Sequence, residues 1–260
     1  MNLNLNNKVI LITGGAKGIG LGIAKVLAAE GAIPFIIGRN EEDNKQAVNE
    51  IETTGGQAKF VTADLVYPAD CERAVKEVLL TNGRIDGLVN NAGVNDGVGL
   101  ENGNYESFVA SLHKNLIHYY LMAKYTLPEL KKTKGAIVNI GSKTAETGQG
   151  HTSAYSAANG GRNALTREWA LELLPYSIRV NAVIVAECYT PLYEAWIKTF
   201  DDPEEKLRQI TAKIPFGKRM TTAEEIANAV AFLLSDKSGH TTGQLIHVDG
   251  GYTHLDRALQ

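Results

Sequence analysis

The sequence predicts an α/β fold, in which one doubly wound parallel sheet of about seven strands carries helices on both faces. Short apolar runs rich in β-branched residues recur along the 260 residues, and helical patterns separate them. A glycine-rich turn joins the first such run to the first helix. Strands that alternate with helices form parallel sheets covered on both faces. Such sheets bind ligands beyond the carboxyl ends of their strands, where the strand order reverses.

The first strand is expected at Val9–Ile12, because a short, continuous apolar run is typical of a strand buried in a parallel sheet. The first helix follows the glycines and ends at Gly31. Similar runs predict the remaining strands at Ile33–Ile37, Lys59–Thr62, Gly87–Asn90, Ala136–Ile140, Ile178–Val183 and Leu245–Val248. The remaining helices are predicted near Glu42–Thr53, Ala69–Asn82, Tyr105–Leu130, Ser153–Leu174 and Thr222–Leu234.

Length and composition favour a single domain over residues 1–260, because no low-complexity linker or internal repeat divides the chain. Tyr193, Trp196 and Phe200 are spaced as in a lid near residues 187–215, although such aromatics also simply pack helices. The net charge of -3 argues against nucleic acid and anionic membranes as partners. The polar start and two cysteines without metal-like spacing predict a cytoplasmic protein with reduced thiols and no metal.

The segment Thr13–Gly20 (TGGAKGIG) predicts a dinucleotide site. A strand, a glycine turn and a helix place backbone N–H groups and a positive helix end where a pyrophosphate can bind. Glycine spacing alone is a weak signal, since tight turns also use glycine, but here it is the first turn of an alternating chain. The residues expected to contact the cofactor are Gly14, Lys17, Gly18, Ile19 and Gly20.

The end of the second strand predicts which cofactor is preferred. A carboxylate there binds the ribose 2′-hydroxyl of NAD and repels the 2′-phosphate of NADP. This chain has Gly38 there with Arg39 next, and Lys17 lies in the glycine loop. Two cations favour a phosphate, so NADP is expected, with NAD possible. The alternative is that both are solvated surface cations, near Glu41 and Glu42.

Several motifs then occur in one order along nearly the whole chain, namely Thr13–Gly20, Asn90–Gly93, Asn115, Ser142, Tyr155 and Arg179–Asn181. In this order they resemble the short-chain dehydrogenase/reductase family, which implies a Rossmann fold and an NAD(P)-dependent oxidoreductase. A narrower resemblance, to the bacterial L-fucose dehydrogenase branch, is carried by Gly87–Leu100, Asn115–Tyr120 and Gly250–Leu259. It implies oxidation of a sugar at C1 to a lactone.

The resemblance also implies further cofactor contacts. Asn91, Ala92 and Gly93 would pack near the adenine and the nicotinamide ribose, although a turn that supports the sheet needs the same residues. Asp64 would accept a hydrogen bond from the adenine amino group, with Leu65 against the ring. The alternative for Asp64 is a helix cap. Thr190 would bind the nicotinamide carboxamide. Because members of the family usually assemble as homotetramers or homodimers, the resemblance also implies such an assembly.

For catalysis, the resemblance implies Tyr155 as acid and base, Ser142 as the residue that orients the substrate oxygen, and Asn115 as a helix bend that holds a water. The family places a lysine four residues after the tyrosine, where it binds the cofactor ribose and favours the phenolate. This chain has Asn159 there, which can bond ribose hydroxyls but carries no charge. Lys143 and Arg162 are the candidate substitutes, and the sequence places neither.

Polar residues in the loops after strands suit a polyhydroxylated small-molecule substrate, and those expected to contact it are Asn95, Lys143, Gln149 and Glu187. The function predicted is therefore hydride transfer between NADP or NAD and such a substrate, for example L-fucose or a related aldose. Two alternatives stay open. One is a carbonyl reductase that runs in the opposite direction. The other is a cofactor-binding protein with little turnover, because Asn159 replaces the lysine.

Overall fold

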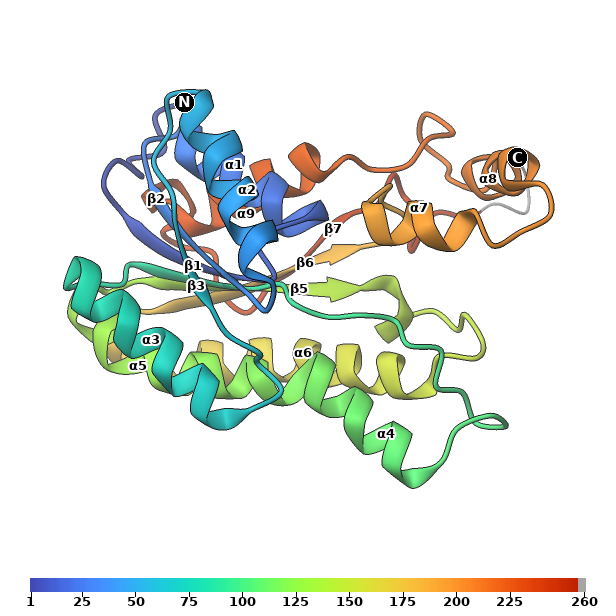
Figure 1. Cartoon of the computed structure of the whole chain (residues 1–260), viewed down its shortest axis with the longest axis horizontal. Coiled ribbons are helices and arrows are strands. Elements are labelled where there is room, and N and C mark those ends of the chain that lie inside the picture. The colour runs from blue at the N-terminus through green and yellow to red at the C-terminus, as the bar shows by residue number, and fades with distance from the viewer. Residues whose placement is uncertain (257–260) are drawn as a thin grey trace.

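The computed structural model describes residues 1–256, and these form one seven-stranded sheet in the order β3-β2-β1-β4-β5-β6-β7 (Figure 1). Every neighbouring pair of strands runs parallel, which confirms the predicted fold class. The strands are β1 Val9–Thr13, β2 Ile33–Gly38, β3 Lys59–Thr62, β4 Gly87–Asn90, β5 Ala136–Ser142, β6 Arg179–Val185 and β7 Leu245–Val248. The end of the tail motif, residues 257–259, lies outside the described residues.

Helices cover both faces of the sheet, as predicted (Figure 1). On one face α1 (Gly18–Ala29) packs beside α9 (Ala223–Leu234), with α2 (Glu41–Thr53) next to them. On the other face lie α3 (Pro68–Asn82), α5 (His118–Thr133) and α6 (Ser153–Glu172). Each face has its own buried apolar cluster, because the strands of a doubly wound sheet are apolar on both sides.

The strand order reverses between β1 and β4. β1 pairs with β2 on one side and with β4 on the other. The strands β2 and β3 are therefore added on one side of β1, and the strands from β4 to β7 are added on its other side. The loops after these two strands carry the glycine loop and Asn90–Gly93. A ligand crevice is expected at this point.

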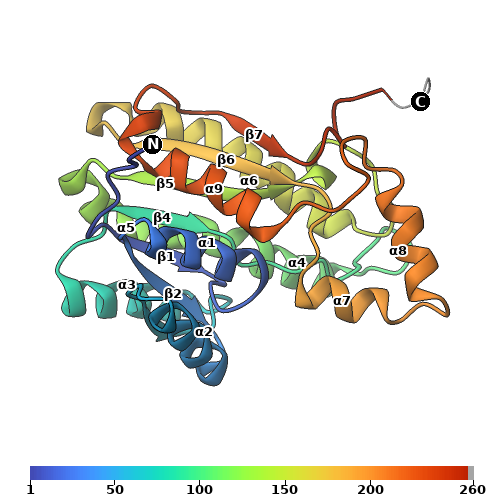
Figure 2. The same ribbon diagram turned by 90° about the horizontal axis from the view of Figure 1, so that it is seen from above.

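Two parts of the chain differ from the predicted elements. The helix expected over Tyr105–Leu130 is α4 (Tyr105–Leu112) and α5, joined by a π-turn over His113–Ile117. The segment expected as a lid contains two short helices, α7 (Pro191–Ile197) and α8 (Pro203–Thr211), which lie beyond the strand ends (Figure 2). Within residues 1–256, no helix combines the length and the apolarity needed to cross a bilayer.

Candidate active site

The glycine loop is shaped so that only glycine fits at its key positions. Gly14 and Gly18 have φ values of 63° and 55°, in the left-handed region that favours glycine. A Cβ on Gly20 would lie 2.2 Å from the carbonyl oxygen of Gly14. Helix α1 starts at Gly18 with no side-chain cap and no acidic residue in its first turn. Its N–H groups are therefore available to a pyrophosphate, and the loop fits a dinucleotide.

The loop after β4 braces the glycine loop. Asn91 donates from its amide nitrogen to the carbonyl oxygens of Thr13 and Gly14, at 2.8 and 3.1 Å. The backbone N–H groups of Asn91 and Ala92 donate to the hydroxyl of Thr13, at 2.8 and 3.0 Å. The two turns at the reversal of strand order are thus held as one unit. Ile19 packs its side chain toward the core of this face.

At the end of β2, Gly38 leaves no room for a side chain. A Cβ there would lie 2.3 Å from Oδ1 of Asn44, which is buried and donates from its amide nitrogen to the Gly38 carbonyl at 2.9 Å. A carboxylate side chain is therefore excluded from position 38. Arg39 is exposed, whereas Lys17 forms an ion pair with Asp43 at 2.8 Å. Asp43 would compete with a bound phosphate for Lys17.

The other predicted cofactor contacts border the same edge. Helix α3 starts at Pro68 after Tyr67, so Asp64 is not its cap, and the side chain of Asp64 accepts from the N–H of Val66 at 3.2 Å. Leu65 is buried. The hydroxyl of Thr190 caps α7. If Gly18 carried a Cβ atom, that atom would lie 3.2 Å from the methyl group of Thr190. Thr190 therefore lies against the glycine loop.

Ser142 and Tyr155 come from two neighbouring elements. Ser142 is the last residue of β5 and is buried, and its hydroxyl oxygen accepts from the N–H and hydroxyl of Thr144 at 3.3 and 3.1 Å. Tyr155 lies in the first turn of α6 and is partly exposed. A partly open phenol near a strand end can exchange a proton with a ligand in the crevice.

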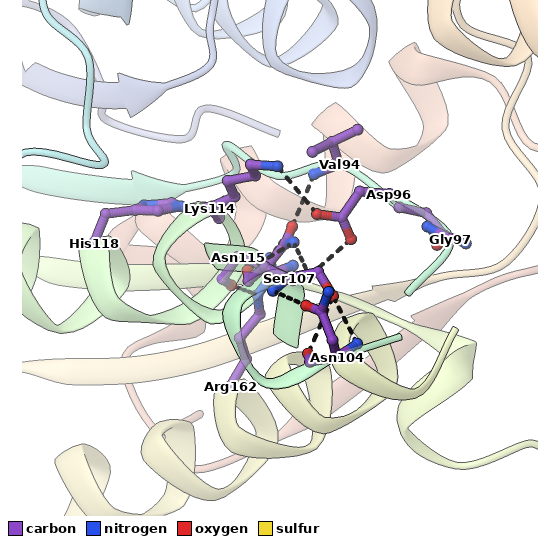
Figure 3. Close-up of polar contacts among 11 residues, drawn as sticks. Val94, Asp96, Gly97, Asn104, Ser107, Lys114, Asn115, His118 and Arg162 are labelled. Carbon is purple, nitrogen blue, oxygen red and sulfur yellow. Dashed lines mark hydrogen bonds and ion pairs between the residues drawn. The ribbon is translucent and has the colours of Figure 1, made fainter. Parts of the chain in front are cut away.

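Asn115 lies at the centre of the π-turn (Figure 3). Its side-chain oxygen accepts from the N–H of Val94 at 2.8 Å, and its amide nitrogen donates to the carbonyl oxygen of Ser111 at 3.0 Å. The helix is therefore irregular at Asn115, whose side chain ties the loop after β4 to α4, and its role in holding a water stays a prediction. π-turns often mark functional sites.

Asn159 is fully buried, and both polar atoms of its amide already have partners. Its nitrogen donates to the carbonyl oxygen of Tyr155 at 2.9 Å, and its oxygen accepts from Arg162 at 3.0 Å. In this arrangement the amide is hydrogen-bonded to the backbone of its own helix and to the side chain of Arg162. Because the side chain is fully buried, it would have to become accessible before it could contact a cofactor ribose.

Arg162, one of the two candidate substitutes for the absent lysine, lies in a buried hydrogen-bond network that the sequence could not place. Its side chain donates to the carbonyl oxygens of Asn115 and Ile140 at 2.6 and 3.1 Å (Figure 3). The guanidinium carbon lies 4.2 Å from the ring centre of Tyr119 and 6.0 Å from that of Tyr155. Among the salt bridges of residues 1–256, none involves Arg162, although it is only 3% exposed.

The predicted substrate residues divide into two groups. Lys143 and Glu187 form a buried ion pair, and the ammonium lies 3.9 Å from the ring centre of Tyr252. Burial, and then Glu187, raise the pKa of the neighbouring Tyr193. Asn95 and Gln149 are exposed in separate loops, and the side chain of Asn95 accepts from the N–H of Gly97. Lys143 and Glu187 are thus brought together, and the other two are not.

A polar cluster that the sequence did not predict joins three distant segments. A carboxylate oxygen of Glu146 lies 3.1 Å from Nε2 of His247 and 3.9 Å from Nε2 of His254. Its other oxygen accepts from Asn163 at 3.4 Å. Three atoms of metal-ligating type lie within 4.8 Å of one another here, although the sequence predicted no metal. Glu146 is more than 100 positions from both histidines, so no local sequence motif indicates the cluster.

Comparisons with known proteins agree with this geometry. The family model described as enoyl-(acyl carrier protein) reductase matches residues 14–253. An uncharacterized oxidoreductase of Thermotoga maritima is 37% identical over 96% of this chain and 99% of its own length. Cyclopentanol dehydrogenase of Comamonas sp. is 34% identical (96% and 98%), and bovine (Bos taurus) L-fucose dehydrogenase is 32% identical (96% and 91%).

A solved structure gives the same result for the fold. The crystal structure of Cj0485 dehydrogenase has a TM-score of 0.94 and 47% identity, over 100% of this chain and 99% of that one. These relatives carry the names of oxidoreductases, so they do not support the alternative of a cofactor-binding protein with little turnover. The chain belongs to the short-chain dehydrogenase/reductase family, and it is a nicotinamide-dependent oxidoreductase.

Proposed function

We propose that the enzyme oxidises a small polyhydroxylated substrate, such as L-fucose or a related aldose, at C1 to a lactone. The observation that carries this proposal is the buried Lys143–Glu187 pair, which follows the ends of β5 and β6 and adjoins Ser142 in the chain. A charged donor and acceptor set into a mostly apolar fold suit the hydroxyls of a sugar better than a hydrocarbon. The relative named L-fucose dehydrogenase supports the same substrate class.

The chemistry needs a base for the C1 hydroxyl proton. We assign that proton to the Tyr155 phenolate oxygen, with the Ser142 hydroxyl as the donor that orients the substrate oxygen. When bound, the nicotinamide cofactor accepts the hydride that leaves C1. Gly14, Gly18 and Gly20 would hold its pyrophosphate, and Thr190 its carboxamide. Asn115 keeps the loop after β4 in place beneath it.

NADP is the proposed preferred cofactor, because Gly38 excludes a carboxylate and Arg39 is exposed beside it. The Lys17–Asp43 ion pair opposes this preference, since a 2′-phosphate must compete with Asp43. We expect Asp43→Asn to strengthen NADP binding severalfold and to leave NAD binding unchanged. Arg39→Ala should weaken NADP only. Titration calorimetry of both cofactors tests this, and tighter NAD binding by the wild type would contradict it.

Residues 187–215, with α7 and α8, would act as the lid over the bound ligands. Assembly into a homodimer or homotetramer is proposed, without nucleic acid or membrane as partner. Cytoplasmic location is proposed because Cys71 and Cys188 are both free and buried.

A substrate screen tests the proposed function. Reduction of NADP and NAD is followed with L-fucose, D-arabinose, L-galactose, cyclopentanol and simple secondary alcohols, from neutral to alkaline pH. We expect turnover of the sugars with NADP, and loss of most of it in Tyr155→Phe. Glu187→Gln should raise KM for the sugars more than it lowers kcat. Activity on hydrophobic alcohols with none on sugars would refute the substrate class, and full activity of Tyr155→Phe would refute the assigned base.

A further inference from the structure

We propose that Arg162 supplies the fixed positive charge of this active site and acts as a positioning residue through Tyr155, whose phenolate it favours. The inference rests on the proposed role of Tyr155 as the proton acceptor. Tyr155, Asn159 and Arg162 are at i, i+4 and i+7 of α6, so they share one face of the helix. The charge absent at position 159 is therefore present one turn later.

The charge of Arg162 is buried without an opposite charge beside it. Buried ions usually have a partner of opposite sign, because their desolvation is costly. The acceptors that Arg162 contacts within residues 1–256 are all neutral, namely the carbonyl oxygens of Asn115 and Ile140 and the amide oxygens of Asn159 and Asn115. Arginine keeps its proton when buried, whereas lysine readily loses it. The site therefore keeps a positive charge at neutral and alkaline pH.

The backbone is built around this guanidinium. A Cβ on Gly93 would lie 2.8 Å from Nη2 of Arg162 and 2.9 Å from the side-chain oxygen of Asn115. Gly93 belongs to the loop that braces the glycine loop, so the guanidinium packs directly against this loop. Asn159 holds the guanidinium with its oxygen and holds the Tyr155 turn with its nitrogen. The network links Arg162 to both sides of the site.

Other charges on the packed elements do not replace it. Lys143, the other candidate, is neutralised by Glu187. Lys114 pairs with Asp96 at 3.3 Å, and Glu146 bonds His247. Two further titratable neighbours are neutral at working pH: His118, whose pKa burial and then Arg162 lower to about 3, and Tyr119, whose pKa burial raises. Tyr119 also donates its hydroxyl to the carbonyl oxygen of Ile140, whereas Tyr155 is partly exposed.

The direction of the effect follows from the sign of the charge. The guanidinium carbon lies 6.0 Å from the centre of the Tyr155 ring, and a positive charge in the protein interior attracts the negative charge of a phenolate. Because Arg162 is 3% exposed, it does not reach a bound cofactor directly. Its loss should therefore change the pH dependence of turnover and leave cofactor affinity nearly unchanged.

The test uses the full-length protein without cofactor as well as the working enzyme. Protein labelled with ¹³C at the tyrosine ring is titrated by NMR, and Tyr155→Phe identifies the Tyr155 signal. We expect Arg162→Met to move the Tyr155 titration, and the alkaline rise of kcat/KM, to higher pH, because the charge that favours the phenolate is lost. Arg162→Lys should resemble the wild type only below the pH at which the buried lysine loses its proton, and should resemble Arg162→Met above it. The proposal is overturned if Arg162→Met leaves both midpoints unchanged.

Two further variants separate charge from packing. Arg179→Met removes another half-buried arginine, which donates to the carbonyl oxygens of Leu233 and Ser235 at the opposite end of the sheet, and its profile should match the wild type. In Asn159→Lys/Arg162→Met the charge returns to position 159, and both midpoints should return toward wild type. If Arg162→Met does not fold, the double variant tests the proposal in its place. Midpoints of the double variant at higher pH than those of the wild type would then count against the proposal. An enzyme inactive on every sugar would refute the proposed function, whereas the NMR titration would still report on Arg162.

Discussion

At the scale of single residues, the buried His118 lies close enough to Arg162 to respond to its charge. Its ring is buried, Nε2 lies 3.0 Å from the carbonyl oxygen of Lys114, and Nδ1 has no partner among the described residues. Burial, and then Arg162, lower its pKa from 6.5 to about 3 (Figure 3). The histidine therefore stays neutral in the folded protein over the range in which an unfolded chain would protonate it.

This difference predicts acid sensitivity. Between pH 6.5 and about 3, His118 is protonated in the unfolded state and neutral in the folded state. The free energy of unfolding therefore decreases as pH falls through this window. His118→Phe should remove this component, worth at most about 5 kcal/mol. Urea unfolding across the window measures it, with the exposed His240→Phe as the control. A pH profile for His118→Phe that coincides with the wild type would contradict the assignment.

The residues predicted from motifs were those whose roles depend on local position. Gly14, Gly18 and Gly20 follow a strand, and Ser142 ends one, so their surroundings could be foreseen from the order of elements. The partners of Arg162 could not be foreseen. They include Asn115, 47 positions away, and Ile140, and side-chain contacts of this range depend on how α6 packs on the π-turn.

At the scale of elements, the strands were predictable because buried parallel strands are continuous apolar runs. The π-turn was not, because the surrounding residues keep a helical pattern and the extra residue in the turn leaves no mark in the composition. Helices α7 and α8 were also missed as helices. They are short, and the first turn of each is set by a proline and a capping side chain, Thr190 and Asp202.

The start of helix α9 allows the contribution of a helix cap to stability to be tested. This helix packs against α1, which begins at the glycine loop. Thr222 and Glu225 form a capping box, and Arg219 donates to the Glu225 carboxylate. Arg219, and then the cap, lower the pKa of Glu225 from 4.5 to about 2. The stability that this pairing contributes is therefore present above about pH 4.5 and lost as pH falls toward 2.

Glu225→Gln should accordingly lower the free energy of unfolding by about 1 kcal/mol at neutral pH, since the group is partly exposed and solvent weakens the pair. The difference from the wild type should vanish near pH 2. Chemical unfolding at both pH values measures it. Glu224→Gln, a neighbouring acidic residue for which no such box is found, is the control, and an equal loss in both variants would contradict the capping argument.

At the scale of the whole molecule, the parallel sheet and its two covered faces were predictable, whereas the strand order was not. Alternating strands and helices fix the class, but the chain can add each new strand on either side. The Glu146 cluster illustrates the same limit, since it joins the loop after β5, β7 and the C-terminal segment. Such contacts arise only once the sheet order has placed β5 near β7.

The exposed face of α6 carries the last prediction, which concerns assembly. Ala157, Gly160 and Ala164 lie along one face of the helix at i, i+3 and i+7, and a Cβ on Gly160 would meet no atom of residues 1–256 within 4 Å. A glycine inside a helix costs about 1 kcal/mol relative to alanine, and close approach of a second copy would offset that cost. The neighbouring Gly161 instead faces Leu116 of the same chain.

If the proposed homo-oligomer uses this face, Gly160→Leu should lower the mass in solution while the helical content stays unchanged, because the chain itself has room for the larger side chain. Light scattering after size exclusion and circular dichroism measure the two properties. Gly148→Leu, at another glycine whose Cβ would meet nothing within 4 Å, should keep the wild-type mass. Wild-type mass in Gly160→Leu would exclude this face from the assembly, and a monomeric wild type would reject the assembly itself.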